Sequence, residues 1–358
     1  MTNKRQKTVV VGMSGGVDSS VTAALLKQQG YSVIGVYMKN WSDDFGDYGC
    51  TWAQDAEDAR KVAQVLEIPF YVWNFEKEYY QHVVEYFLKE YQAGRTPNPD
   101  ILCNSEIKFK VFLDKALALG ADVVATGHYA RVKETGGVFE LLKGLDPAKD
   151  QSYFLYRLTQ KQLSKVLFPI GEFQKSKVRE LAREFNLPTH AKKDSQGICF
   201  IGQIDVMQFL REHIKAKVGE IVTTTGQSLG NHTGLPYYTI GQREGIGIGG
   251  DGPYYVVGKD FKANQLLVTN DKNDPQLWKN ELLISDLTWT NDEPEFPLNA
   301  GVSIRYNHAD YPAIITRIKK GKLHVKFQDL QRAITPGQSA VIYSADRLLG
   351  GGIIDQVK

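Results

Sequence analysis

A loop rich in glycine and serine near the N-terminus has the composition of a phosphate-binding site. It consists of Gly12, Met13, Ser14, Gly15, Gly16, Val17, Asp18 and Ser19, between a β-branched run and a stretch with helical spacing of apolar residues. Backbone N–H groups in such a turn and the positive end of the helix dipole together favour an anion. The loop lacks the GK[ST] ending of a Walker loop and does not fit a GxGxxG dinucleotide fingerprint. A tight strand-to-helix turn capped by serine is the alternative interpretation.

Three cysteines are the other candidate reactive groups, and they are Cys50, Cys103 and Cys199. This odd, sparse set cannot form a secreted disulfide framework, and without CxxC spacing we expect no structural zinc site. Cys103 lies in the proline-containing loop PNPDILCN, ahead of a helix expected to start near Ile107, where a thiol gains acidity. Cys199 lies in the polar glycine loop DSQGICF. Both settings favour exposed, reactive thiols, although a cysteine taken alone is more often a buried small hydrophobe. Cys50 has no such context.

A second glycine-rich stretch, from Gly245 to Gly250, can also be spelled GxGxxG. The run that follows it, Pro253 to Val257, is typical of a strand, whereas a dinucleotide site requires a helix there. We interpret Gly241 to Gly252 as a loop, either mobile and functional or an ordinary flexible hairpin.

Apolar periodicity predicts the elements that position these groups. Strand-like runs at 8–13, 31–38, 70–74 and 122–126 alternate with helical stretches at 17–29, 51–66, 79–91 and 108–119. Such alternation is typical of an α/β fold with a parallel sheet. A short helical piece at 205–213 then gives way to β-rich runs, and the runs after about 281 indicate a small antiparallel barrel or sandwich. We therefore predict an α/β catalytic domain over 1–204, a central β-rich linker domain over 205–280 and a C-terminal β-barrel over 281–358.

Composition and charge limit the class of protein. Apolar residues make up 42% and charged residues 23%, close to the averages of soluble globular chains, so neither a disordered nor a fibrous class is favoured. The net charge of +2 is too small for a purely electrostatic nucleic-acid binder, so any RNA contact must come from local patches. The basic run at 317–326 is either such a patch or a solvated hairpin. No apolar run is long enough to span a membrane and the N-terminus is polar, so we expect a cytoplasmic protein.

Together these segments resemble the tRNA-specific 2-thiouridylase family, over essentially the whole chain. The matching segments are GMSGGVDS at 12–19, GVYMKNW at 35–41, GRTPNPDILCN at 94–104, ATGHYA at 125–130, KDQSYFL at 149–155 and DSQGICF at 194–200. The first of these also resembles the pyrophosphate loop of the N-type ATP pyrophosphatases, which cleave ATP between the α and β phosphates. The resemblance thus implies a PP-loop ATP pyrophosphatase fold, adenine nucleotide alpha hydrolase-like, for the N-terminal domain.

The same resemblance implies an ATP site and a pair of cysteines. Residues 12–19 would bind the ATP phosphates with Mg²⁺, while Met38 and Gly127 would contact the adenosine part; alone, these two residues would be interpreted as core filling and a tight turn. Because the uracil 2-oxygen is a poor leaving group, ATP would adenylate it before sulfur replaces it. Cys199 would carry the sulfur as a persulfide and Cys103 would be the nucleophile. The resulting Cys103–Cys199 disulfide would then need reduction by an external thiol.

The resemblance also implies contacts to tRNA. The implied contacts to the target base are Asn98, Pro99 and Asp100, and those to the rest of the tRNA are Lys149, Asp150, Gln151, Arg305 and Tyr306. Taken alone, Asp100 either shuttles a proton or forms a turn, and the Arg305-Tyr306 pair is more often ordinary sheet surface. The implied partners are tRNA, whose wobble uridine in the Lys, Glu and Gln acceptors is the target, and a persulfide donor, either a cysteine desulfurase or a sulfur-relay protein.

Two other functions remain open. One is an AMP-forming ligase of the same loop class that acts on a small molecule, such as a carboxylate. The other is an ATP-responsive RNA-binding protein with inert cysteines. Pyrophosphate release that depends on tRNA distinguishes them, because a ligase would ignore tRNA and a binding protein would release none.

Overall fold

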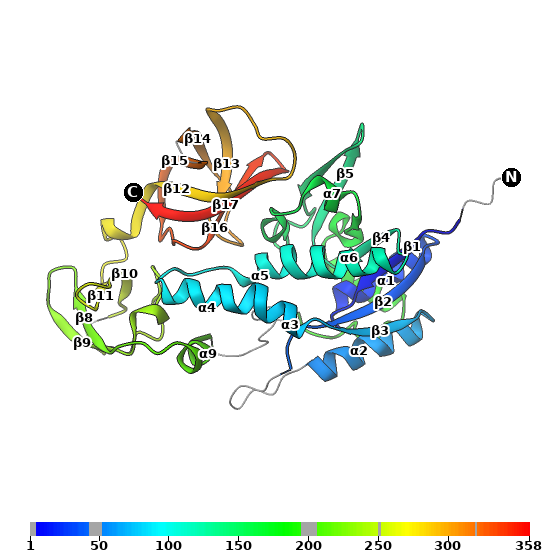
Figure 1. Ribbon diagram of the computed structural model, residues 1–358, viewed down its shortest axis with the longest axis horizontal. Coiled ribbons are helices and arrows are strands. Elements are labelled where there is room, and N and C mark those ends of the chain that lie inside the picture. The colour runs from blue at the N-terminus through cyan, green and yellow to red at the C-terminus, as the bar shows by residue number, and fades with distance from the viewer. Residues whose placement is uncertain (1–4, 43–51, 195–205, 250–251, 319–320) are drawn as a thin grey trace.

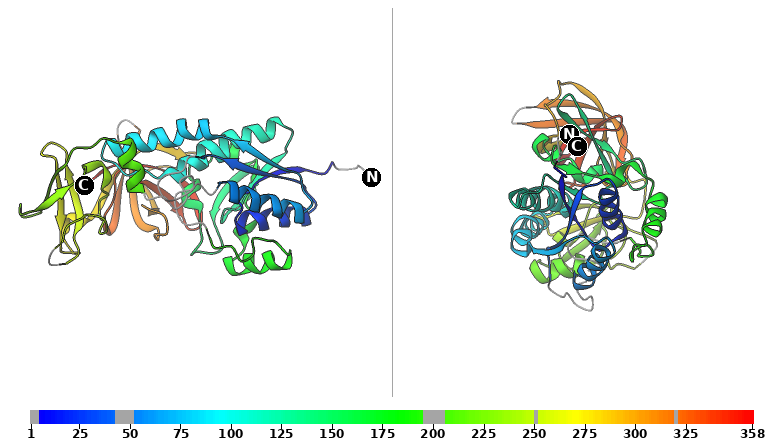
Figure 2. Two further views of the ribbon diagram at one scale, coloured as in Figure 1. Left: turned by 90° about the horizontal axis from the view of Figure 1, so that it is seen from below. Right: turned by 90° about the vertical axis from the view of Figure 1, so that its right-hand side faces the viewer.

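The computed structural model describes residues 5–42, 52–194, 206–249, 252–318 and 321–358. Three β-sheets organise the chain, as Figure 1 shows: one in the N-terminal part, one in the central part and one in the C-terminal part. The molecule is elongated, with the N-terminal sheet toward one end and the central sheet at the other (Figure 2). Within the described ranges, no helix has both the length and the apolar composition that crossing a bilayer requires.

The N-terminal part contains a parallel sheet of five strands. They are β1 (Thr8–Gly12), β2 (Ser32–Lys39), β3 (Phe70–Asn74), β4 (Val123–Thr126) and β7 (Val166–Leu167), in the order β3-β2-β1-β4-β7. Every neighbouring pair is parallel, which confirms the predicted α/β class. The chain leaves β1 toward β2 on one side and returns to β4 on the other, so the strand order reverses at β1. In open α/β sheets, ligands bind at the carboxyl ends of the strands at such a point.

Helices cover this sheet, and two of them are long composite runs. The separate helices are α1 (Val17–Gln28), α2 (Trp52–Val65) and α8 (Lys175–Glu184). One composite run joins α3 (Glu76–Tyr79), the π-helical η1 (Tyr80–Val84) and α4 (Glu85–Gln92); the other joins α5 (Pro99–Leu102), the π-helical η2 (Cys103–Phe112) and α6 (Leu113–Ala118).

The second composite run starts earlier than the sequence predicted. Asn98 caps it, because its side-chain oxygen accepts from the N–H groups of Asp100 (3.1 Å) and Ile101 (3.4 Å). Pro99 follows at the first helical position, where its fixed φ favours a helix and its missing N–H costs nothing. The prediction of a helix start near Ile107 was therefore wrong, since this capping signal lies well before it.

A hairpin that the sequence did not predict connects the N-terminal part to the C-terminal sheet. Its strands are β5 (Ala130–Thr135) and β6 (Val138–Lys143), and β6 pairs with β17 through Leu141 and Leu142. Short helical segments follow: η3 (Ser152–Leu155), α7 (Gln160–Leu163) and η4 (Pro169–Glu172).

The central part contains α9 (Val206–His213), η5 (Leu235–Tyr237) and a sheet of four strands. The strands are β8 (Gly219–Thr223), β9 (Ser228–His232), β10 (Tyr255–Asp260) and β11 (Gln265–Thr269), in the order β10-β11-β8-β9. The glycine-rich stretch that resembles a dinucleotide fingerprint precedes β10, a strand, as its sequence context predicted.

The C-terminal part is a closed barrel of six strands, which decides between the predicted barrel and sandwich. After η6 (Pro275–Leu277), the strands are β12 (Trp278–Trp289), β13 (Leu298–Ser303), β14 (Tyr311–Ile318), β15 (Lys322–Arg332), β16 (Ser339–Ser344) and β17 (Arg347–Val357). Pairing of β12 with both β15 and β17 closes the barrel. Its interior is filled by alternating apolar residues such as Leu323, Val325 and Phe327. The barrel therefore has no interior channel and can act only through its surface.

Candidate active site

The predicted nucleotide-binding residues meet at one edge of the parallel sheet. Gly12 ends β1, Met38 lies near the end of β2, and Gly127 follows β4. A Cβ atom at Gly12 would lie 2.9 Å from Met38 Cε. A Cβ atom at Gly127 would lie 2.7 Å from the backbone nitrogen of Ser19, so β4 ends directly against the loop. Close packing against backbone atoms requires glycine at 127, whereas the contact at Gly12 is with the flexible end of the Met38 side chain. The structure thus brings these three predicted residues together.

The loop itself has a conformation that only glycine allows at its tightest point. Gly15 has a φ of +74°. A Cβ atom there would lie 2.3 Å from the carbonyl oxygen of Asp55 in α2. The hydroxyl of Ser19 accepts from the N–H of Ser14 (3.1 Å), which closes the loop on itself. Because no side chain caps helix α1, its first N–H groups remain directed toward the loop, where an anion can bind them.

Asp18 is the charged side chain of the loop, and a lysine from α8 pairs with it. Lys175 Nζ lies 2.7 Å from Asp18 Oδ1 and 2.8 Å from Oδ2. The hydroxyl of Tyr129 donates to Asp18 Oδ1 at 2.9 Å. Burial and then the charge of Asp18 raise the pKa of Tyr129, so the phenol keeps its proton and acts as a donor. The Asp18 carboxylate is therefore held rigidly beside the loop.

A second carboxylate, Asp194, extends this network. Its oxygens accept from Lys149 Nζ (2.8 Å), Lys175 Nζ (2.9 Å) and Arg179 Nη2 (2.7 Å). Burial alone would raise its pKa, but Lys149 and Lys175 outweigh burial and lower the pKa of Asp194 to about 2. Lys175 thus bridges the glycine loop to Asp194, the first residue of the DSQGICF segment.

Four residues of this network were not predicted as site residues from the sequence: Tyr129, Lys175, Arg179 and Asp194. A signal was present, because Lys175 and Arg179 lie on one helix at an i, i+4 spacing that places them on the same face. What no local pattern shows is that this face turns toward a loop far away in the sequence.

Cys103 lies inside the protein, not on its surface. It is 0% exposed and belongs to a hydrophobic cluster that also contains Ile101 and Ile107. The prediction of an exposed thiol was therefore wrong for Cys103, because the helix begins at Pro99 and packs this face into the core. Cys50 and Cys199 lie outside the described residues.

The predicted base-contacting segment forms the start of the helix that carries Cys103. The side-chain oxygen of Asn98 caps the helix and Pro99 is buried, whereas Asp100 is half-buried. Asp100 and Cys103 are three residues apart on a helix, so they lie on neighbouring positions of one face.

The turn at 149–151 is built by internal hydrogen bonds. Asp150 accepts from the N–H groups of Gly144 (2.9 Å) and Ser152 (3.1 Å). Gln151 accepts from the N–H of Tyr129 (3.0 Å). Asp150 and Gln151 therefore shape the turn that directs Lys149 to the site, and contact of these residues with tRNA stays a prediction.

Arg305 and Tyr306 follow β13 of the barrel. Arg305 Nη2 donates to the carbonyl oxygens of Arg332 (2.9 Å) and Ala333 (2.7 Å). The ring of Tyr306 packs against that of Phe154 at a centroid distance of 4.3 Å. Both side chains are half-buried, so they present only part of their surface to a partner.

In the basic run at 317–326, the arginine and lysines that the structure describes are paired with carboxylates, and residues 319 and 320 lie outside the described ranges. Arg317 pairs with Glu293, Lys322 with Asp355, and Lys326 with Glu281 at 2.9 Å. These pairs favour the solvated hairpin over a strip that binds the RNA backbone. Among the residues that the structure describes, no three His, Cys, Asp or Glu side chains are grouped so that they could hold a metal ion.

Comparison with known proteins covers nearly the whole chain. Family models match in three places: the tRNA methyl transferase HUP domain at residues 7–203, the tRNA methyl transferase PRC-barrel domain at 207–270 and the aminomethyltransferase beta-barrel domain at 279–354. A protein of Shouchella clausii named tRNA-specific 2-thiouridylase MnmA is 52% identical, over 99% of this chain and 98% of its own. A protein of the same name from Chromobacterium violaceum is 53% identical, over 98% of this chain and 92% of its own.

Similarity to solved structures is much weaker. The structure titled U34-tRNA thiolase NcsA from Methanococcus maripaludis matches 53% of this chain and 60% of its own, at 18% identity and a TM-score of 0.36. A likeness of this size supports no statement about function.

Proposed function

We propose, because the chain belongs to the tRNA-specific 2-thiouridylase family, that it thiolates the wobble uridine of the Lys, Glu and Gln tRNAs through an adenylated intermediate. The single observation that carries the activation step is the packing of the glycine loop, Met38 and Gly127 at the switch point of the sheet. The enzyme class, a tRNA sulfurtransferase, follows from the family.

ATP activates the uridine in this proposal. The phosphates lie on the N–H groups of the loop at the start of α1. The uracil 2-oxygen attacks the α-phosphorus, pyrophosphate leaves, and the proton of uracil N3 is released. Lys175 is already beside the loop and can pair with the charge on the leaving pyrophosphate, while Asp194 keeps it in place. Asp18 offers carboxylate oxygens of the kind that Mg²⁺ prefers, and the ion, when bound, would neutralise phosphate charge.

Sulfur then replaces the activated oxygen by one of two routes. In the first, the terminal sulfur of a Cys199 persulfide attacks C2 and AMP leaves with the former 2-oxygen; the Cys103 thiolate then attacks Cys199 Sγ and leaves sulfur on C2. In the second, the Cys103 thiolate attacks Cys199 Sγ first, and the hydrosulfide released attacks C2. Both routes end in a Cys103–Cys199 disulfide, which two electrons from an external thiol must reduce. Asp100 would return the proton to N3.

The proposal requires Cys103 to become accessible. In the described structure its side chain is fully buried, so a base or persulfide can reach it only if the helix starting at Pro99 shifts. The target base must also leave its stack, as bases do in enzymes that modify them. The proposed sulfur donor is a cysteine desulfurase or a relay protein, and the proposed location is the cytoplasm.

The names of the family models mention methyl transfer, whereas the names of the relatives mention thiolation. We favour thiolation, because a methyl donor already carries an activated group and would not need an ATP loop. Formation of AMP separates these two chemistries.

The test is the transfer of labelled sulfur from cysteine, through a desulfurase, to an unmodified glutamate tRNA transcript. We expect label in the wobble base only when ATP and both cysteines are present, and none with Cys103→Ser or Cys199→Ser. Label that enters tRNA without ATP would exclude the adenylation step. If ATP is split to AMP only with tRNA but no label is transferred, activation is correct and the assignment of the sulfur step is wrong.

A further inference from the structure

The segment that leads into the Cys103 helix is held by the barrel. The N–H of Thr96 donates to the carbonyl oxygen of Pro336 at 2.9 Å. The side-chain amide of Gln338 donates to the carbonyl oxygens of Thr96 (2.8 Å) and Pro97 (3.3 Å). A single side chain of the barrel therefore binds two successive carbonyls directly before the Asn98 cap.

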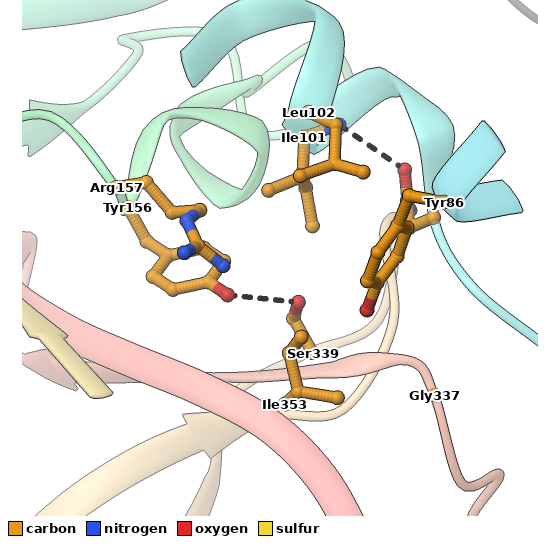
Figure 3. Close-up of a pocket in the computed structure, with 9 residues that line it drawn as sticks. Tyr86, Ile101, Leu102, Tyr156, Arg157, Gly337, Ser339 and Ile353 are labelled. Carbon is orange, nitrogen blue, oxygen red and sulfur yellow. Dashed lines mark hydrogen bonds between the residues drawn. The ribbon is translucent and has the colours of Figure 1, made fainter. Parts of the chain in front are cut away.

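The two backbones approach each other more closely than a side chain would allow. Gly337 has a φ of +94°, and a Cβ atom there would lie 2.8 Å from Thr96 N and 3.0 Å from Arg95 Cβ. Figure 3 shows the neighbouring seam, where Ser339 and Ile353 of the barrel face Ile101 and Leu102 of the helix. This seam fixes the helix start against the barrel.

The barrel side of the seam is anchored in two further ways. Ile354 of β17 accepts from the N–H of Gly337 (2.9 Å) and donates to the carbonyl oxygen of Gln338 (2.8 Å). The hydroxyl of Tyr153 donates to the carbonyl oxygen of Ser339 at 2.9 Å. The segment that carries Gln338 is thus defined by hydrogen bonds to β17 and Tyr153, and its position sets where the side-chain amide holds the two carbonyls.

The central part of the chain holds the same segment from the other side. The hydroxyls of Thr96 and Thr239 lie 3.0 Å apart. A Cβ atom at Gly94 would lie 2.3 Å from the ring of Phe261. The residues before the helix are therefore fixed by both other parts of the molecule, whereas the helix itself belongs to the α/β part.

The barrel segment that holds the helix is also bonded to Arg305, a predicted tRNA contact. Arg305 donates to the carbonyls of Arg332 and Ala333, and the Thr335 hydroxyl donates to Ala333 at 2.9 Å. Residues 332–338, which we term the linking segment, thus run from Arg305 at one end to Gln338 at the other. A short series of hydrogen bonds therefore joins Arg305 to the residue that holds the start of the helix.

We propose that Gln338 is a positioning residue that couples tRNA docking on the barrel to the placement of Asp100 and Cys103. When tRNA binds Arg305, the guanidinium changes its hydrogen bonds to the carbonyl oxygens of Arg332 and Ala333. The linking segment then moves Thr96 and Pro97 through Gln338, and the helix start shifts so that Cys103 becomes reachable. This coupling rests on the proposed function, because it assigns the reaction to the helix that carries Cys103.

The test compares Gln338→Met, which keeps the length of the side chain but removes the donor, with Gln356→Met. Gln356 is exposed on β17 of the same barrel and serves as the control. The measured quantities are the tRNA Kd, kcat for thiolation, and the alkylation rate of Cys103 with and without tRNA, read from the Cys103 peptide by mass spectrometry. Circular dichroism and thermal unfolding confirm that each variant is folded.

In the wild type and in Gln356→Met, we expect tRNA to raise the alkylation rate of Cys103 by about tenfold or more, the size of a coupling of about 1.4 kcal/mol. In Gln338→Met the rise should fall below about twofold and kcat should drop by about tenfold, with the tRNA Kd within about twofold. Arg305→Met should remove the same tRNA-induced rise in the alkylation rate of Cys103. The double variant of Arg305 and Gln338 should lose no more of this rise than either single variant, as expected if both residues act through the same segment.

Three results would overturn the coupling. The first is a raised tRNA Kd with unchanged kcat in Gln338→Met, which would make Gln338 a tRNA contact. The second is an unchanged response of Cys103 to tRNA in that variant, and the third is additive loss in the double variant. Alkylation and tRNA binding need no sulfur transfer, so failure of the proposed thiolation in the wild type is a separate outcome from failure of the coupling.

Discussion

Replacement of Gly127 by alanine tests whether the edge of the parallel sheet is the nucleotide site. The added methyl group would lie 2.7 Å from Ser19 N and 2.8 Å from the carbonyl carbon of Asp18. Both are backbone atoms in the first turn of α1, so no side-chain rotation can relieve the contact. The loop and the end of β4 must separate instead.

The size of the effect follows from that geometry. Ordinary contact begins near 3.4 Å, so the two backbones must separate by about 0.7 Å, and overpacking of this kind costs about 1–3 kcal/mol. If the loop moves out, its N–H groups no longer match the phosphates; if it stays, binding must occur in a strained protein. Since 1.4 kcal/mol is a factor of ten, we expect Gly127→Ala to weaken ATP binding by about 10- to 100-fold.

The assay is isothermal titration of ATP into the wild type, Gly127→Ala and a control. Gly249→Ala is the matched control, because nothing lies within 4 Å of a Cβ atom there and Gly249 does not have a positive φ. The control should bind ATP like the wild type. If Gly127→Ala is folded and also binds ATP like the wild type, the phosphate site is not at this loop.

Three further predictions concern charged side chains. Lys175→Met should reduce tRNA-dependent pyrophosphate release by about 100-fold or more, as loss of a charge aimed at a transition state does, while Lys175→Arg retains part of the rate. The pKa of Asp194 is lowered to about 2, so its ion pairs stabilise the folded protein above a pH of about 4. This stabilisation is lost as the pH falls toward 2, and Asp194→Asn should flatten that part of the acid unfolding curve. Burial lowers the pKa of Lys259 to about 8, so between pH 8 and about 10.4 the unfolded chain binds more protons and stability rises with pH. Lys259→Met should abolish that rise in urea unfolding, whereas the exposed Lys262 is a control whose replacement should not.

The parallel sheet was predictable from the sequence because its signals are local. The run Val9 to Val11 is β-branched and buried on both faces, as is typical of a strand inside a parallel sheet. A stretch with helical spacing of apolar residues follows it directly, so both elements can be predicted from neighbouring residues. The glycines of the loop were equally readable, since Gly15 needs a positive φ that few other residues adopt. The hairpin β5–β6 was not predictable in the same way, because β6 gains its partner from β17 at the far end of the chain.

The depth of Cys103 illustrates the same limit. The capping residue Asn98 and Pro99 mark a helix start in the sequence, but the buried thiol belongs to a cluster that extends to Val341 and Leu348 of the barrel. No local window contains those residues, so an exposed loop was a reasonable expectation and still wrong.

The same burial has a consequence for how the enzyme must work. A thiol enclosed in an apolar cluster is out of reach of solvent and of reactants, so it cannot react until its surroundings change. Extrusion of the target base and a shift of the helix each cost free energy, on the order of a few kcal/mol for the base alone. If tRNA contacted only the sheet edge at the glycine loop, those few contacts would have to supply all of this free energy. Because the helix start is bonded to the barrel through Gln338, tRNA contacts spread over the barrel can contribute to the same movement. A substrate that engages only one of the two surfaces should therefore bind without exposing Cys103.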